Sequence, residues 1–192
     1  VAGCFYTLSL PAIYTTFKET SRPLAGLTAA AIGTYGIGDC IFTGLFSVDT
    51  ADAQWNFLTW VHNIGSGIGY VGFLLFPLFL YLIYKKQNKR ELSRRYFVLL
   101  FLSLTVAAIY GLARIPQLNQ LVIFKQLGFW QRLSFVFNYL PIVALTMGEI
   151  KKDLITVRRI GKKERSPLVE CFFVLLLSLY TSDAADEGLG VD

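Results

Sequence analysis

The residues that could do chemistry in this chain are a few polar side chains placed inside long apolar stretches. Asp39 and His62 each lie within such a stretch, and Ser66 follows His62 by one helical turn on the same face. Ionisable groups at membrane depth cost free energy, so they mark functional sites by default. A carboxylate and an imidazole near each other could bind a polar ligand or pass a proton. The candidates are Asp39, His62, Asn63, Ser66, Arg114, Arg132 and Asp49.

The same residues also have a purely structural interpretation. Arg114, Arg132 and His62 lie close enough to the ends of their apolar stretches to reach water by snorkelling. The tryptophans near these ends are typical of an interfacial aromatic belt. Asp39 differs, because at about 1.5 Å per residue it lies roughly 10 Å below the end of its stretch at Phe46. Its side chain is too short to reach water easily, so the structural interpretation explains Asp39 least well.

Several enzyme classes do not fit the residue inventory. The chain has one His and three Cys without metal-ligand spacing, whereas catalytic zinc takes three protein ligands, so we expect no metal and no cofactor. The GxSxG, HExxH and P-loop motifs are absent from the sequence. The glycines of GSGIGYVG at 65–72 lie inside an apolar stretch without a preceding strand, which favours packing. Ser66 and His62, one turn apart, are stacked rather than aimed at one substrate, which disfavours a triad with Asp39.

The composition indicates whether these residues lie in a membrane or in water. Hydrophobic side chains make up 54% of the 192 residues and charged ones 16%, and the mean hydropathy is +0.52. Soluble domains carry about 25% charged residues. The net charge is +5, but the basic residues cluster beside apolar runs. That pattern is typical of membrane topology signals and lipid contacts, and it argues against a nucleic-acid partner.

The apolar stretches predict an all-α fold, a polytopic transmembrane helix bundle with five complete spans plus a truncated sixth. None shows the two-residue alternation of a barrel strand. The five stretches cover about 1–17, 24–46, 57–84, 96–113 and 128–147. We expect a helix bundle over 1–147, a basic cytoplasmic segment over 148–166, a truncated apolar span over 167–178, and a sequencing-adapter scar over 179–192. The natural protein would then extend beyond this fragment.

Lysine and arginine are distributed unevenly among the connecting loops. Segment 85–95 holds six and segment 149–166 holds seven, whereas 47–56 has none and 115–127 has only Lys125. The positive-inside rule therefore places the first, third and fifth loops in the cytoplasm of a multi-pass protein of the cell (cytoplasmic) membrane. The third loop would contact anionic lipid headgroups. Its basic residues are Lys85, Lys86, Lys89, Arg90, Arg94 and Arg95.

Small residues predict which spans touch. Gly36, Cys40 and Gly44 follow one another at four-residue spacing in the second span, and Gly65 and Gly69 do so in the third. Helices in lipid approach closely where small residues face each other. We therefore expect the second and third spans to pack together. The same faces could instead serve a partner helix or a second copy of the chain.

The segment GLFSVD at 44–49, followed by His62 and then Gly65, resembles the prokaryotic multi-pass membrane family catalogued as domain of unknown function 998. The resemblance covers about residues 1–147 and implies about six spans, with a Gly-x-Phe-Pro-x-Asp motif before a span that opens with His. Gly44, Phe46, Asp49 and His62 fit that motif, while Ser47 replaces the usual Pro. The family implies no established activity, cofactor or substrate.

The sequence favours a binding, sensing or transport-accessory membrane protein over an enzyme. In this interpretation the polar cluster near the outer face takes up a ligand. The alternative is an intramembrane lipid-modifying enzyme that would use the same residues on a headgroup. A purely structural subunit is a third interpretation, favoured if the faces of Gly36 and Gly65 are exposed in the monomer.

Overall fold

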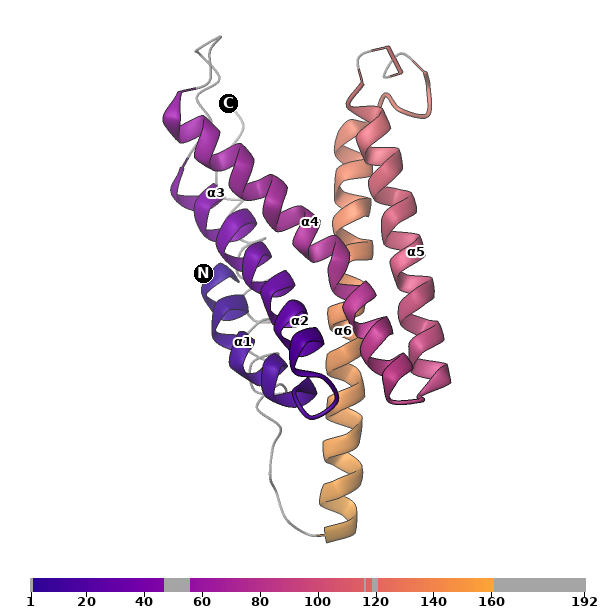
Figure 1. Ribbon diagram of the computed structural model, residues 1–192. Helices are drawn as coiled ribbons and strands as arrows, with labels where there is room; N and C mark the ends of the chain where they lie inside the picture. Colours follow the sequence, from indigo (N-terminus) through magenta and orange to yellow (C-terminus); the bar gives the residue numbers. More distant parts are fainter. Residues whose placement is uncertain (1, 47–55, 116, 119–120, 161–192) are drawn as a thin grey trace. The chain divides into compact units, whose positions relative to one another are not determined.

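The computed structural model describes residues 2–46, 56–115, 117–118 and 121–160. Every secondary-structure element in these ranges is helical, so the predicted all-α class is confirmed. The elements are α1 (Ala2–Phe17), α2 (Arg22–Thr34), η1 (Tyr35–Phe42), α3 (Thr43–Leu45), α4 (Phe57–Lys86), α5 (Arg90–Ala113) and α6 (Leu127–Ile160). Figure 1 shows that α2, η1 and α3 form one uninterrupted rod.

Four of the described helices are long and apolar enough to cross a membrane. They cover Arg22–Leu45, Phe57–Lys86, Arg90–Ala113 and Leu127–Lys152. The expectation of five complete spans is not supported, because α1 has 16 residues, about 24 Å of helix against a hydrocarbon core of about 30 Å. The predicted truncated span at 167–178 lies outside the described residues. Helix α6 runs on past Met147 to Ile160, so the basic segment predicted from 148 starts inside a helix.

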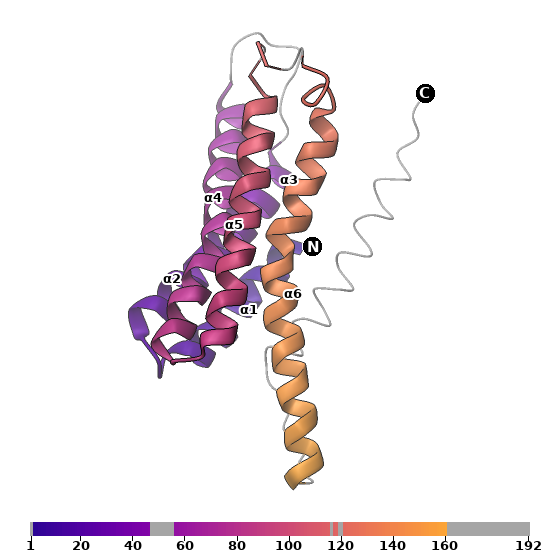
Figure 2. The same cartoon turned by 90° about the vertical axis from the view of Figure 1, so that its right-hand side faces the viewer.

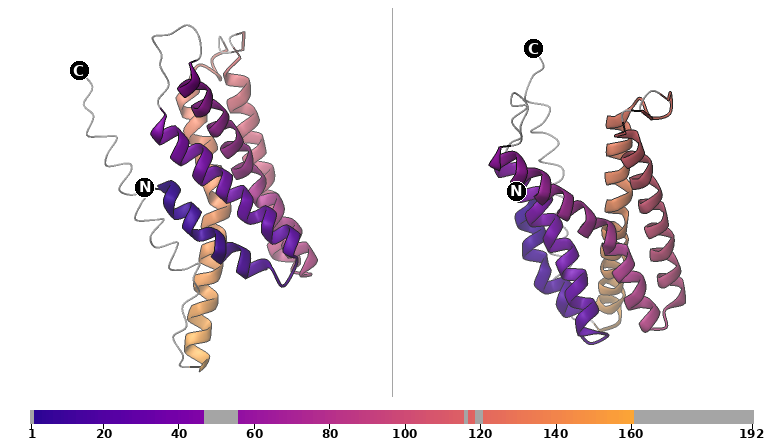
Figure 3. Two further views of the ribbon diagram at one scale, coloured as in Figure 1. Left: turned by 60° about the vertical axis from the view of Figure 1, so that its left-hand side comes forward. Right: turned by 45° about the horizontal axis from the view of Figure 1, so that its top comes forward.

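The chain divides into two compact units. One consists of Val1–Phe73 with Thr146–Asp192, and the other of Leu74–Leu145. In the first, α1 packs along α2 and η1, as Figures 1 and 3 show. Its core contains Tyr6, Tyr35 and Phe73, each at most 2% exposed. The Tyr35 and Phe73 rings stack with centroids 4.0 Å apart, and Tyr6 meets Tyr35 edge-on at 5.1 Å.

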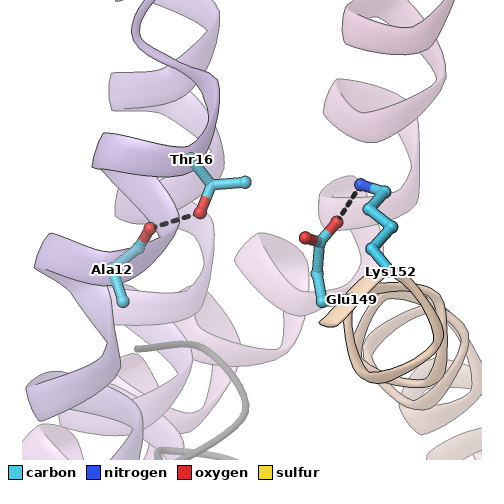
Figure 4. Close-up of polar contacts among 4 residues, drawn as sticks. All are labelled: Ala12, Thr16, Glu149 and Lys152. Carbon is cyan, nitrogen blue, oxygen red and sulfur yellow. Dashed lines mark hydrogen bonds and ion pairs between the residues drawn. The ribbon is translucent and has the colours of Figure 1, made fainter. Parts of the chain in front are cut away.

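Several threonine hydroxyl groups in the first unit are satisfied inside their own helices. Thr16 donates to the carbonyl of Ala12 at 2.8 Å (Figure 4), and Thr28 donates to that of Leu24 at 2.7 Å. Such bonds let a threonine face lipid without an unpaired polar group. Figure 4 also shows the ion pair of Glu149 with Lys152 on α6.

In the second unit, α5 lies beside the first half of α6 (Figure 2). The Ser103 hydroxyl joins them by donating to the carbonyl of Phe137 at 3.0 Å. The end of α4 meets the start of α5 through Tyr84 and Tyr96, whose rings stack at 5.2 Å. The intervening turn places Asn88 at a φ of 56°, a left-handed conformation that asparagine tolerates better than most residues.

Candidate polar site between η1 and α4

Asp39 lies in the middle of a π-helical segment, η1, which reads YGIGDCIF. Glycine favours the α-helix least among non-proline residues, so Gly36 and Gly38 lower the cost of leaving α-helical geometry. Thr43 donates its hydroxyl hydrogen to the carbonyl oxygen of Asp39 and satisfies that group within the helix. Short π-helical segments inside α-helices occur frequently at functional sites. The π-helical backbone and the position of an ionisable residue inside an apolar stretch therefore both point to Asp39 as a functional residue.

The carboxylate of Asp39 is held by a residue from another helix. Ser66 of α4 donates its hydroxyl hydrogen to Oδ1 of Asp39 at 2.5 Å, across a separation of 27 residues. A hydroxyl bonded to a charged carboxylate forms one of the shorter and stronger hydrogen bonds in proteins. Both side chains are partly buried. This bond fixes one carboxylate oxygen between the two helices.

His62 lies one turn before Ser66 on α4 and is also partly buried. Its Nδ1 atom is 2.6 Å from the carbonyl oxygen of Phe46. A carbonyl can only accept, so Nδ1 carries the proton and donates, and in the neutral ring Nε2 is an acceptor. The contact with Phe46 orients the imidazole ring. It also connects the end of the α2–η1–α3 rod to the start of α4.

Glycines allow η1 and α4 to approach at backbone distance. A Cβ atom built on Gly69 would lie 2.7 Å from the backbone nitrogen of Asp39 and 2.8 Å from its Cβ. A Cβ on Gly38 would collide with the carbonyl oxygen of Gly65. Only glycine fits at such contacts. The approach brings Asp39 within reach of Ser66. It also leaves a groove of about 210 Å³ between the helices, lined in part by Gly38, Phe42 and Gly65 but not by Asp39.

Comparison with known proteins settles the family. The family described as "Protein of unknown function (DUF998)" matches residues 1–148. The chain belongs to the DUF998 family. No curated protein and no solved structure matches it. Membership and the four long apolar helices together are consistent with a membrane protein.

The described structure brings some of the predicted site residues of this DUF998 protein together. Asp39 and Ser66 are hydrogen-bonded, and His62 lies one turn away. Asn63 follows His62 on α4 and is partly buried. Asp49 lies outside the described residues.

The two arginines of the predicted cluster belong to the other compact unit. Arg114 ends α5 and Arg132 lies near the start of α6, and both are exposed. The Arg114 guanidinium carbon is 5.9 Å from the ring centroid of Tyr110. A contact of either arginine with Asp39 stays a prediction.

The family-motif residues have different environments in this DUF998 chain. Phe46 supplies the carbonyl that holds His62, which links two positions of the motif. Gly44 has open space at its Cβ position, with no heavy atom within 4 Å. A larger side chain at position 44 would therefore not collide with any neighbouring helix among the described residues.

The predicted pairing of the second and third spans is confirmed, and Gly65 and Gly69 do face the second span, but the face predicted for the second span is wrong. A Cβ on Gly36 would lie 2.8 Å from the Cβ of Tyr6 in α1, so Gly36 faces α1 rather than α4. The glycine that meets α4 is Gly38, which the four-residue spacing missed. Gly36 and Gly65 are both buried, so the condition that would favour a purely structural subunit is not met.

The site offers few ligands for a metal. Asp39 and His62 supply two side-chain donors, fewer than a catalytic zinc takes. Across the described ranges, no three His, Cys, Asp or Glu side chains gather in one place. Ser66 directs its hydroxyl hydrogen to Asp39, and His62 directs its Nδ1 hydrogen to Phe46. These bonds differ from the serine-to-histidine-to-aspartate order of a hydrolytic triad.

Asn138 was not among the residues predicted from the sequence. Asn138 is 1% exposed in α6, and neither of its side-chain polar atoms has a hydrogen-bond partner among the described residues. An unsatisfied buried amide costs about 1–3 kcal/mol. The sequence does contain a signal that could have identified Asn138, namely an asparagine inside the apolar stretch 128–147.

Proposed function

We propose that this chain is a multi-pass protein of a prokaryotic cytoplasmic membrane that binds or senses a small cationic solute at Asp39. The observation that supports this most is the half-buried carboxylate held by Ser66 inside an apolar helix. A carboxylate in a low-dielectric surrounding attracts positive charge strongly. The proton is the simplest such solute, and a small ammonium ion is the next.

The charge balance at the site supports a cationic ligand. Among the described residues the only ion pair joins Glu149 to Lys152, so none involves Asp39. Ser66 satisfies one carboxylate oxygen and leaves lone pairs on the other for a ligand. When the His62 ring is uncharged, its Nε2 atom is a further acceptor. A cation is the partner that would use both acceptors.

Chemical labelling of the carboxyl group tests the proposal. A hydrophobic carbodiimide reacts with protonated carboxyl groups in apolar surroundings, and peptide mass spectrometry reports which residue is modified. We expect modification of Asp39 in the detergent-solubilised protein, and we expect protons to promote it and a bound cation to slow it. The panel would contain Na⁺, K⁺ and small protonated amines at constant ionic strength.

Two variants make the result specific. Asp39→Asn should lose the modification, and Glu19→Gln, which changes an exposed carboxylate in the α1–α2 turn, should keep it. If Asp39 is never modified, or if its modification responds to neither pH nor any cation, the proposed site is refuted. If Asp39→Asn instead abolishes folded protein, the carboxylate belongs to the structure and not to a binding function.

A further inference from the structure

A second groove lies in the other compact unit. It is lined by residues of α5 and α6, two helices that lie side by side in Figure 2. Its volume is about 430 Å³, about twice that of the groove lined by Gly38, Phe42 and Gly65. Unlike that groove, it combines charged and apolar walls. Its lining consists of Glu91, Arg94, Arg95, Val98, Leu99 and Ala144.

Five of the six lining residues form one stripe along α5. They occur at positions i, i+3, i+4, i+7 and i+8, which is the spacing of a single helical face. The stripe changes character along the helix, because its first turn is charged and its next turn is apolar. Across the groove, the small side chain of Ala144 on α6 leaves the space open. Val98 is 47% exposed, so the apolar part of the stripe is available to a ligand.

The charges at the groove favour an anion. Segment 85–95 carries six basic residues and one acidic residue, Glu91. No described ion pair uses Arg94 or Arg95, and both side chains are exposed. Two adjacent guanidinium groups suit a phosphate, which they can bind through forked hydrogen bonds.

The position of the groove on a membrane-spanning helix indicates what kind of anion fits. Helix α5 is a candidate span that begins at Arg90, so its first turns lie at one boundary of the apolar layer. At about 1.5 Å per residue, Val98 and Leu99 lie roughly 6 Å deeper than Arg94 and Arg95. A phosphate at the arginines would thus have acyl chains beside the apolar residues. A free phosphate ion would leave the apolar wall unused.

We propose that this groove binds one anionic glycerophospholipid, with its phosphate at Arg94 and Arg95 and an acyl chain against Val98, Leu99 and Ala144. Basic residues near a membrane surface favour anionic lipid by about fivefold in affinity each. The groove differs from general surface attraction because it adds a defined apolar contact. Glu91 opposes the anion and limits the affinity.

Native mass spectrometry of the full chain in detergent tests this proposal, with phosphatidylglycerol and phosphatidylcholine as the lipid probes. We expect one phosphatidylglycerol to bind in preference to phosphatidylcholine. Arg94→Gln with Arg95→Gln should weaken that binding about thirtyfold. The matched control is Lys85→Gln with Lys86→Gln. It removes the same charge from the last turn of α4, outside the groove, and should change binding far less.

Two further variants address the apolar wall and folding. Ala144→Phe keeps every charge but fills the groove, and it should also weaken binding at least several-fold. Glu91→Gln keeps both arginines and should tighten binding several-fold, which tests the proposal even if the double arginine variant does not fold.

Three results would overturn the proposal. One is an equal loss in the lysine and arginine pairs, which would indicate diffuse attraction by the whole basic segment. The second is equal binding of phosphatidylcholine. The third is full displacement of the lipid by inorganic phosphate with no effect of Ala144→Phe, which would identify a site for a free anion.

Discussion

The close approach of η1 and α4 predicts that alanine at two neighbouring glycines has opposite effects. A Cβ on Gly69 would meet backbone and Cβ atoms of Asp39 at 2.7 and 2.8 Å and the carbonyl oxygen of Thr34 at 3.0 Å. A Cβ on Gly67, two residues earlier in the same helix, would meet no heavy atom within 4 Å. The pair Gly69→Ala and Gly67→Ala therefore isolates the helix contact.

The magnitude follows from two contributions. Both variants gain the helix propensity of alanine over glycine, about 0.8–1 kcal/mol. Only Gly69→Ala also overpacks a tight contact, which typically costs about 1–3 kcal/mol. The atoms it meets are mostly backbone, so the helices must separate rather than a side chain rotate. We expect Gly69→Ala to have a free energy of unfolding about 1–3 kcal/mol lower than that of Gly67→Ala, which should match or exceed the wild type.

Reversible unfolding in mixed micelles, followed by circular dichroism, measures this difference. Because Gly69 touches Asp39, carbodiimide modification of Asp39 should change in Gly69→Ala and stay unchanged in Gly67→Ala. Equal stabilities of the two variants would refute the close contact at Gly69. A loss of stability without any change at Asp39 would instead show that this contact does not position the carboxylate.

Three other outcomes are expected. Ser66→Ala should lower the free energy of unfolding by about 1.5–3 kcal/mol, since it removes a bond to a charged group. Unfolding in micelles of this variant, of Asp39→Asn and of the double variant would show whether the two losses are coupled. Fully additive losses would argue against the bond. Asn138→Leu should be neutral or stabilising in the same assay, because an unsatisfied buried amide is replaced by an apolar side chain of similar size; a marked loss would reveal an amide partner. In a background without native cysteines, Asp52→Cys should react with an impermeant thiol reagent from outside intact cells and Lys89→Cys should not, and the reverse pattern would invert the predicted topology.

The helical fold was predictable because long apolar runs leave few other solutions in lipid. The stretch 1–17 was counted as a complete span, although an apolar run of 17 residues is at the lower limit for crossing and α1 covers 16 of them. The proximity of Asp39 to Ser66 was predictable from depth alone, since successive spans run in opposite directions. Depth could not show whether the arginines reach Asp39, because rotation of each helix about its axis is set by packing.

The helix face was mispredicted because four-residue spacing identifies a face of small residues but not the neighbour that covers it. Gly36 and Cys40 both face α1, since a Cβ on Gly3 would lie 2.5 Å from the Gly36 carbonyl oxygen and 2.9 Å from the Cys40 Cβ. Of the three positions at this spacing, Gly44 alone has no neighbour, because a Cβ there would meet no heavy atom of the described residues within 4 Å. Gly36 and Gly38 are two positions apart and therefore point to roughly opposite sides of the helix, Gly36 toward α1 and Gly38, with Asp39, toward α4. A π-helix bonds residue i to i+5 and therefore winds more residues into each turn than an α-helix. A regular α-helix through this segment would rotate Asp39 relative to Gly36, so the π-helical winding is itself part of how the chain positions its carboxylate against Ser66.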